Sequence, residues 1–360
     1  MRVCLCFFSV FILSCGDRLS AESSADIPMW RGTDVLAVGP HPVTTSTETF
    51  IDTTRVTPAN GDYEGAPDRK LVTEIWAPQG EGPWPLLLYA HGFMSSRLDN
   101  ALLCEHLASH GFIVAGVDFP LSHLGAPGGA TVLDVSSQPG DLSFVLDQLL
   151  VSDLGQQIMS DQIGVVGLSL GGLTGLLMTH DPERRDARVR ALAAIAAPSC
   201  FLPDTFFEDR GIKLLLLHGM MDAIVPYAEN AVAGYESAYS PKIRVGIAKG
   251  THTGFADVAG ELFSELPNAD QVGCAAIEGN LPTLDTPVDS LGWAVDPSRC
   301  PAVCEGPLEP ALSTLRQLEL LRLVVTTFFA SSLQTEPGAT RLLIEGLSGE
   351  ADELHVEAAF

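Results

Sequence analysis

The sequence predicts an α/β protein built on a doubly wound, mostly parallel sheet. Short apolar runs at residues 85–90, 162–167 and 212–219 alternate with stretches of helical periodicity. A strand that is apolar throughout is typical of burial on both faces, and strands that alternate with helices form right-handed parallel units. We therefore expect one sheet with helices covering both of its faces.

Size and charge limit the possible functions. The chain has 360 residues, of which 46% are hydrophobic, and this is enough for one large domain. Its 45 acidic and 20 basic residues give a formal net charge of −25. Such a charge repels phosphate backbones and anionic membrane surfaces. We expect no nucleic-acid partner and a monomer whose acidity serves solubility.

The first fifteen residues, MRVCLCFFSVFILSC, predict an export signal. One arginine precedes an apolar run at residues 3–13, which is too short for a membrane-spanning helix. Residues 12–15 resemble a bacterial lipobox, in which Cys15 would carry the lipid, and cleavage near residues 19–21 remains the alternative. We expect an extracytoplasmic protein, either a lipoprotein of the bacterial cell envelope or secreted. Membrane contact would come only through lipid on Cys15.

Disulfides persist outside the cytoplasm, so the cysteines after residue 15 matter. Five remain, and an odd number leaves one thiol free: Cys104, Cys200, Cys274, Cys300 and Cys304. A bond from Cys274 to Cys300 or Cys304 would close a loop-rich segment, although spacing does not fix the pairing. No histidine or CxxC pair accompanies these cysteines at zinc-ligand spacing, so the sequence predicts no metal.

The domain is predicted at residues 33–335, after a polar tether at residues 16–32. Alternating residues before the first buried run predict an antiparallel edge to the sheet. Only about fifteen residues separate the apolar runs at 191–198 and 212–219, which leaves no room for a large lid. We expect a cysteine-containing insertion at residues 256–308 and a C-terminal tail at residues 336–360.

Ser169 lies where a predicted strand meets a predicted helix, in the sequence GLSLG at residues 167–171. This context fits the motif G-x-S-x-G. Glycine is needed where a Cβ would strike the neighbouring strand or helix, and the serine must accept a strained backbone. The hydroxyl then projects beside the unpaired N–H groups of the helix. Ser169 is the predicted nucleophile.

A serine nucleophile needs a histidine base, and the base needs a carboxylate that fixes its tautomer. With this motif the order along the chain is Ser, acid, His. Among the histidines that follow Ser169, the candidates are His218, His252 and His355. His252 follows a predicted strand in a loop of small residues and is the predicted base. We interpret His218 as a loop-shaping residue and His355 as a solvated residue of the acidic tail.

Asp222 is the predicted acid. It comes three residues after the glycine that ends an apolar run, and Pro226 closes its loop. The carboxyl ends of parallel strands meet at one edge of a sheet, so Asp222 is expected beside Ser169 and His252. An acidic cluster after the preceding strand remains the alternative: Asp204, Glu208 and Asp209.

The tetrahedral intermediate also needs hydrogen-bond donors for its oxyanion. The backbone N–H of Leu170, directly after the nucleophile, is one predicted donor. The second is the N–H of Phe93, because His91 and Gly92 turn the chain sharply after a buried strand. His91 itself is interpreted as a scaffold residue. This chemistry requires no metal and no organic cofactor.

The motifs HGF, GLSLGG, HGMMD and GTHTGF, in this order, resemble those of the α/β-hydrolase superfamily. More narrowly, residues 51–97 are similar to bacterial proteins related to platelet-activating-factor acetylhydrolase, which are often labelled dienelactone-hydrolase-like. The resemblance covers roughly residues 33–332. It implies a serine carboxylester hydrolase that acts on a lipid or small-molecule ester. Dienelactone hydrolases use cysteine where this chain has Ser169, and residues 256–308 have no counterpart in the common pattern.

Two other functions remain open. A serine peptidase on the same fold would need an acidic pair that anchors the substrate amine and a large gating domain, for which the chain has no room. A non-catalytic binding protein would have no reason to retain both a base and an acid. An esterase acting through an acyl-enzyme is therefore the preferred hypothesis.

Overall fold

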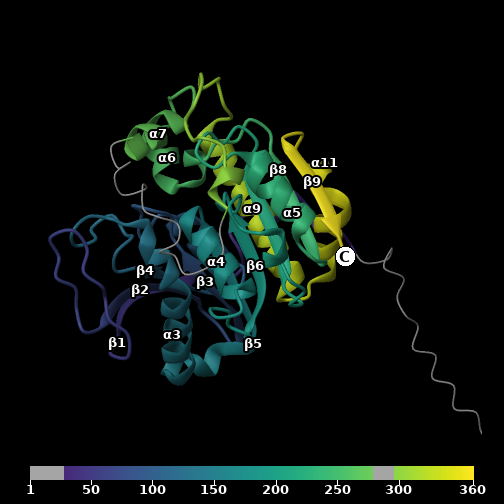
Figure 1. Ribbon diagram of the computed structural model, residues 1–360. Coiled ribbons are helices and arrows are strands. Elements are labelled where there is room, and N and C mark those ends of the chain that lie inside the picture. Colours follow the sequence, from purple (N-terminus) through teal and green to yellow (C-terminus); the bar gives the residue numbers. More distant parts are fainter. Residues whose placement is uncertain (1–27, 279–295) are drawn as a thin grey trace, which may run out of the picture.

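One nine-stranded sheet organises residues 28–278 and 296–360, which the computed structural model describes (Figure 1). The predicted signal at residues 1–15 lies outside these described residues. The strands are β1 (Val43–Asp52), β2 (Arg69–Pro78), β3 (Trp84–Ala90), β4 (Ile113–Asp118), β5 (Ile158–Leu168), β6 (Val189–Ile195), β7 (Lys213–Gly219), β8 (Lys242–Ile247) and β9 (Leu354–Ala359).

The strand order confirms the predicted doubly wound sheet. Across the sheet the order is β1-β2-β4-β3-β5-β6-β7-β8-β9, and the six strands from β3 to β8 are parallel to one another. β2 pairs antiparallel with both β1 and β4, which gives the predicted antiparallel edge. At the opposite edge β9 pairs antiparallel with β8. The parallel strands therefore present their carboxyl ends along one edge.

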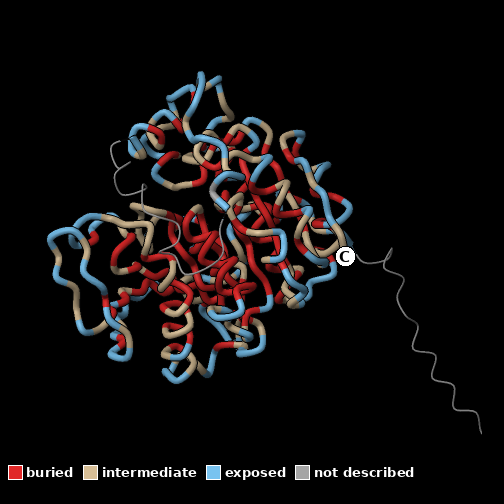
Figure 2. The backbone as a smooth tube through the Cα atoms, in the orientation of Figure 1, coloured by how far each residue is buried: buried red, intermediate tan, exposed pale blue. Residues whose placement is uncertain are grey.

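Helices cover both faces of the sheet, and the most buried residues lie between them and the strands (Figure 2). One face packs against α1, α2 and α9, and the other packs against α3, α4 and α5. The helices are α1 (Gly32–Leu36), α2 (Ala101–Ser109), α3 (Gln138–Val151), α4 (Leu170–His180), α5 (Ala233–Ser237), α6 (Asp257–Leu262), α7 (Asp270–Glu278), α9 (Thr314–Ser332), α10 (Pro337–Arg341) and α11 (Leu347–Glu350). None of these described helices is long and apolar enough to cross a membrane.

The predicted C-terminal tail at residues 336–360 is wrong. These residues form α10, α11 and the edge strand β9, and Leu342, Leu343 and Leu354 are buried in the core. The sequence did not reveal this strand because β9 is stabilised by backbone hydrogen bonds to β8, which is distant in the chain. An edge strand that contains charged residues also shows no apolar run in the sequence. His355 is exposed on this strand, as a solvated side chain should be.

The predicted tether at residues 16–32 is also wrong for its last residues. The side chain of Trp30 packs against the core, and its backbone N–H donates to the carbonyl of Gly338 at 3.1 Å. A Cβ on Gly338 would lie 2.4 Å from Cδ1 of Trp30, so only glycine permits this approach. The two ends of the described chain therefore pack on each other, which a reading of local periodicity cannot reveal.

Two disulfides hold the described parts of the cysteine-containing insertion, residues 256–278 and 296–308, whereas residues 279–295 lie outside the described residues. Cys274 on α7 bonds to Cys304, which is one of the two predicted pairings, and Cys200 bonds to Cys300. Cys104 is the free thiol among the described residues and is buried on α2. The insertion is thereby tied to the loop that follows β6.

Candidate active site

Ser169 occupies a strained turn between β5 and α4. Its backbone has φ 54° and ψ −117°, a left-handed value that non-glycine residues rarely adopt. The strain is held in place because the Ser169 N–H donates to the carbonyl of Ile195 at 2.8 Å, and the Ser169 carbonyl accepts from the N–H of Leu173 at 3.1 Å. The side chain is partly accessible while the neighbouring residues are buried.

The glycines around Ser169 are required by space. A Cβ on Gly167 would lie 2.1 Å from the carbonyl oxygen of Gly171, and one on Gly171 would lie 2.0 Å from that of Ala90. A Cβ on Gly172 would lie 2.7 Å from Cβ of Ala197. The start of α4 can therefore approach β3 and β6 closely, which is the steric reason that the sequence motif anticipates.

Ser169, His252 and Asp222 form one hydrogen-bonded chain. Nε2 of His252 lies 2.9 Å from Oγ of Ser169, and Nδ1 of His252 lies 2.8 Å from Oδ2 of Asp222. Each residue follows the carboxyl end of a parallel strand, namely β5, β7 and β8. The arrangement lets Nδ1–H donate to the carboxylate while Nε2 accepts the serine proton.

The environment keeps Asp222 ionised. Burial alone would raise its pKa, but the charge of His252 and hydrogen bonds from His218 and His252 lower the pKa of Asp222 to about 2. Its Oδ1 also accepts the backbone N–H groups of Ile224 at 2.9 Å and Val225 at 2.6 Å. Burial lowers the pKa of His252, and the carboxylates of Asp222 and Asp270 outweigh it, so the net shift is upward from 6.5.

The predicted oxyanion donors lie at the same rim. A Cβ on Gly92 would sit only 3.5 Å from Cβ of Ser169, so the turn after β3 passes directly beside the serine. Within the described residues neither Phe93 nor Leu170 donates its N–H to another group of the fold. Both amides thus remain free to donate to a bound group.

His91 holds this turn in shape. Its Nδ1 lies 2.7 Å from the carbonyl of Gly92, and its Nε2 accepts the N–H of Phe119 at 3.2 Å. Burial lowers the pKa of His91 to about 4, so the ring is neutral at neutral pH. These contacts agree with a scaffold role.

Comparisons with known proteins match this architecture. Residues 40–195, which include the turn after β3 and Ser169, match the family model named Chlorophyllase. The chain is also similar to a solved structure, the ferulic acid esterase from Streptomyces cinnamoneus. The superposition covers 82% of this chain and 91% of the esterase chain, with 22% sequence identity and a TM-score of 0.58. The chain has the α/β-hydrolase fold.

A curated relative of this hydrolase-fold protein is Chlorophyllase-1, chloroplastic, from Citrus sinensis. The two are 27% identical over 151 residues, which is 41% of this chain and 44% of the relative. The chain therefore spans less than half the length of that relative. The α/β-hydrolase fold expected from the motifs is confirmed. The narrower platelet-activating-factor acetylhydrolase-like branch stays a prediction.

Two of the acidic residues considered as alternatives to Asp222 bind arginine side chains and not His252. Asp204 accepts from Arg299 at 2.6 Å and Glu208 accepts from Arg210 at 2.6 Å, and neither contacts His252. His218 donates from Nε2 to the carbonyl of Val225 at 2.6 Å and lies 3.3 Å from Asp222. Within the described residues no group of three or more His, Cys, Asp or Glu side chains is placed to hold a metal ion.

Two residues near His252 were missed by the sequence reasoning. Gln317 on α9 accepts the N–H of Thr251 at 2.9 Å and donates to its carbonyl at 2.7 Å. Asp270 on α7 accepts backbone N–H groups from the loops that carry Asp222 and His252. Neither belongs to a motif, because each acts on backbone groups distant in sequence.

Proposed function

We propose that the protein is a serine carboxylester hydrolase that works through an acyl-enzyme intermediate. The observation that carries the proposal is the chain of hydrogen bonds from Asp222 through His252 to Ser169, next to the amides of Phe93 and Leu170. The Chlorophyllase family match and the esterase neighbour support an ester as the substrate class.

In the first half-reaction His252 is the general base. Nε2 takes the proton of Ser169 as Oγ attacks the carbonyl carbon of the ester. The negative oxygen of the tetrahedral intermediate accepts from the N–H groups of Phe93 and Leu170. The imidazolium, stabilised by Asp222, then protonates the leaving alcohol, and the acyl group stays on Ser169.

In the second half-reaction water releases the acid. His252, neutral again, takes a proton from a water molecule that attacks the acyl carbonyl. The tetrahedral intermediate collapses, Oγ leaves and regains its proton from the imidazolium. The donors and the base act in both halves, so one arrangement serves the whole cycle.

The proposed location is outside the cytoplasm. The disulfides Cys200–Cys300 and Cys274–Cys304 support it, because such bonds are rare in reducing compartments. The natural substrate is proposed to be a lipid ester or a small-molecule ester, and hydrolysis of p-nitrophenyl esters from acetate to palmitate would define its acyl length.

The central test is Ser169→Ala. Without Oγ no acyl-enzyme can form, so we expect hydrolysis of p-nitrophenyl acetate to fall by about 10⁴-fold or more. A fluorophosphonate probe should label wild-type Ser169 and not the variant. Ser348→Ala, at an exposed position of α11, is the matched control and should keep full activity. Substantial turnover by Ser169→Ala would refute the assignment.

A further inference from the structure

Asp270 is a fully buried carboxylate that contacts both loops of the active site. It is the first residue of α7, within the insertion that follows His252. Its Oδ2 accepts the N–H of Ala223 at 3.0 Å and that of His252 at 3.2 Å. Its Oδ1 accepts the N–H of Thr253 at 2.7 Å. One side chain thus joins the residue after the acid to the base itself.

The position of Asp270 is fixed by its own neighbours. Its N–H donates to Oδ1 of Asn268 at 2.9 Å, and Nδ2 of Asn268 donates to the carbonyl of Glu309 at 2.8 Å. One turn further along α7, a Cβ on Gly273 would lie 2.3 Å from Oγ1 of Thr253. The helix therefore packs directly on the loop of His252, at a distance that only glycine allows.

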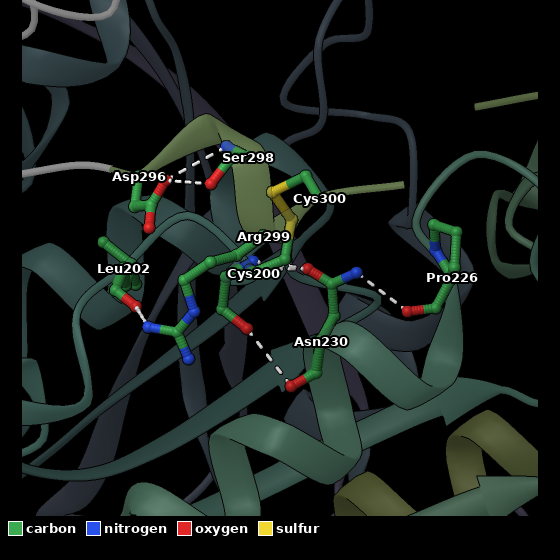
Figure 3. Close-up of a disulfide and its surroundings, with 9 residues drawn as sticks. Cys200, Leu202, Pro226, Asn230, Asp296, Ser298, Arg299 and Cys300 are labelled. Carbon is green, nitrogen blue, oxygen red and sulfur yellow. Dashed lines mark hydrogen bonds between the residues drawn. A yellow bond between two sulfur atoms is a disulfide. The ribbon is translucent and has the colours of Figure 1, made fainter. Parts of the chain in front are cut away.

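The disulfides anchor this helix to the rest of the rim. Cys274 on α7 is bonded to Cys304, whose N–H donates to the carbonyl of Ala223 at 2.7 Å. The neighbouring Cys300 is bonded to Cys200 (Figure 3). Helix α7 is thus bonded covalently to Cys304, and Cys304 is hydrogen-bonded to the loop of Asp222.

Asn230 contacts both Cys200 and Pro226, as Figure 3 shows. Its Oδ1 accepts the N–H of Cys200 at 2.9 Å, and its Nδ2 donates to the carbonyl of Pro226 at 2.8 Å. Arg299, next to Cys300, donates to the carbonyl of Leu202 at 2.8 Å. Asn230 therefore joins Cys200, the disulfide partner of Cys300, to the loop of Asp222.

We propose that Asp270 is a positioning residue, which holds the loops of Asp222 and His252 in the spacing that their hydrogen bond needs. This inference rests on the proposed esterase function. The catalytic carboxylate Asp222 binds the imidazole, whereas Asp270 binds the backbone of His252 and fixes where the ring begins. Helix α7 of the insertion thereby supports the loops that carry Asp222 and His252.

The charge of Asp270 also acts on the base. The titratable groups that face His252 within the described residues are Asp222, Asp270 and, across Asp222, His218. A negative carboxylate near an imidazole favours its protonated form. Asp270 adds to Asp222 in raising the pKa of His252, so it has an effect that a purely structural contact lacks.

The test is Asp270→Asn in the full-length protein. In this variant an NH₂ group replaces one of the two carboxylate oxygens. A donor cannot accept from the backbone N–H groups, so the variant cannot keep all three hydrogen bonds. We expect kcat for p-nitrophenyl acetate to fall about 10- to 100-fold with little change in KM, as for other residues that orient a catalytic group. The pKa of His252, read by NMR of labelled histidine, should fall.

Two variants serve as comparisons. Asp181→Asn changes another buried carboxylate that accepts backbone N–H groups, from Glu183 and Arg184, at the far end of α4. It should leave kcat and the pKa of His252 unchanged. Gln317→Leu removes a neutral support of the same loop. It should lower kcat and leave the pKa of His252 near its wild-type value.

An Asp270→Asn protein with wild-type kcat and an unchanged His252 pKa would overturn the proposal. If that variant does not fold, Asp270→Glu retains the charge on a longer side chain. We expect lower kcat and a His252 pKa that stays raised, and wild-type kcat would again overturn the proposal. The NMR titration needs no turnover, so it tests Asp270 even if Ser169-dependent hydrolysis is absent.

Discussion

Nδ1 of His252 lies 2.8 Å from Oδ2 of Asp222, although 30 residues separate them in the chain. The carboxylate is buried and accepts two backbone N–H groups on its other oxygen. This geometry sets both the tautomer and the orientation of the imidazole. The predictions below test what the two residues, and the elements that bring them together, contribute.

Asp222→Asn should nearly abolish activity while preserving the fold. An amide donates towards Nδ1 and favours the tautomer whose Nε2 cannot accept the serine proton, so kcat should fall about 10³- to 10⁴-fold. Hydrolysis of p-nitrophenyl acetate at pH 8 measures the loss. The matched control is Asp204→Asn, whose side chain is 74% exposed and pairs with Arg299. Equal losses in both variants would contradict the choice of Asp222.

The pH profile should report His252. The base must be neutral to accept the serine proton, so kcat/KM should rise with pH through the pKa of His252. Because this pKa is raised from 6.5, the midpoint should lie above pH 6.5. Initial rates from pH 5 to 9 with a short-chain ester provide the measurement. A profile that is flat over this range would argue against His252 as the base.

Gly171→Ala should disrupt the turn that holds Ser169. The added Cβ would lie 2.0 Å from the carbonyl oxygen of Ala90, and backbone cannot move aside cheaply. We expect the free energy of unfolding to decrease by at least about 1–3 kcal/mol, and the activity to fall as well. Gly349→Ala is the control, since nothing lies within 4 Å of its Cβ position on α11. Urea unfolding of both variants would show whether only the first is destabilised.

Peptide mapping without reduction should recover the bonds Cys200–Cys300 and Cys274–Cys304. The buried thiol of Cys104 should not react with a thiol-modifying reagent until the protein unfolds. The Cys200→Ser, Cys300→Ser double variant should lose about 2–5 kcal/mol of unfolding free energy, because it opens a loop spanning 100 residues. Recovery of Cys104 in a disulfide would contradict the structure.

The sheet, and the order of nucleophile, acid and base along the chain, could be predicted from the amino-acid sequence. Apolar runs marked the buried strands β3, β5 and β7, and a serine flanked by glycines marked the turn between β5 and α4. These signals are local: a strand buried on both faces must be apolar, and a turn without room for a Cβ must contain glycine. The resulting expectation that Ser169, Asp222 and His252 meet depends only on parallel strands ending at one edge.

The contacts that support the site could not be predicted from the sequence and became visible only in the folded protein. The pairing of Cys200 with Cys300, the edge strand β9 and the contacts of Asp270 all join segments distant in sequence. A carboxylate that accepts backbone N–H groups imposes no residue type on its partners, and an edge strand needs no apolar run. Such contacts leave no periodic or spacing signal in the chain, because their specificity resides in backbone geometry created by the fold.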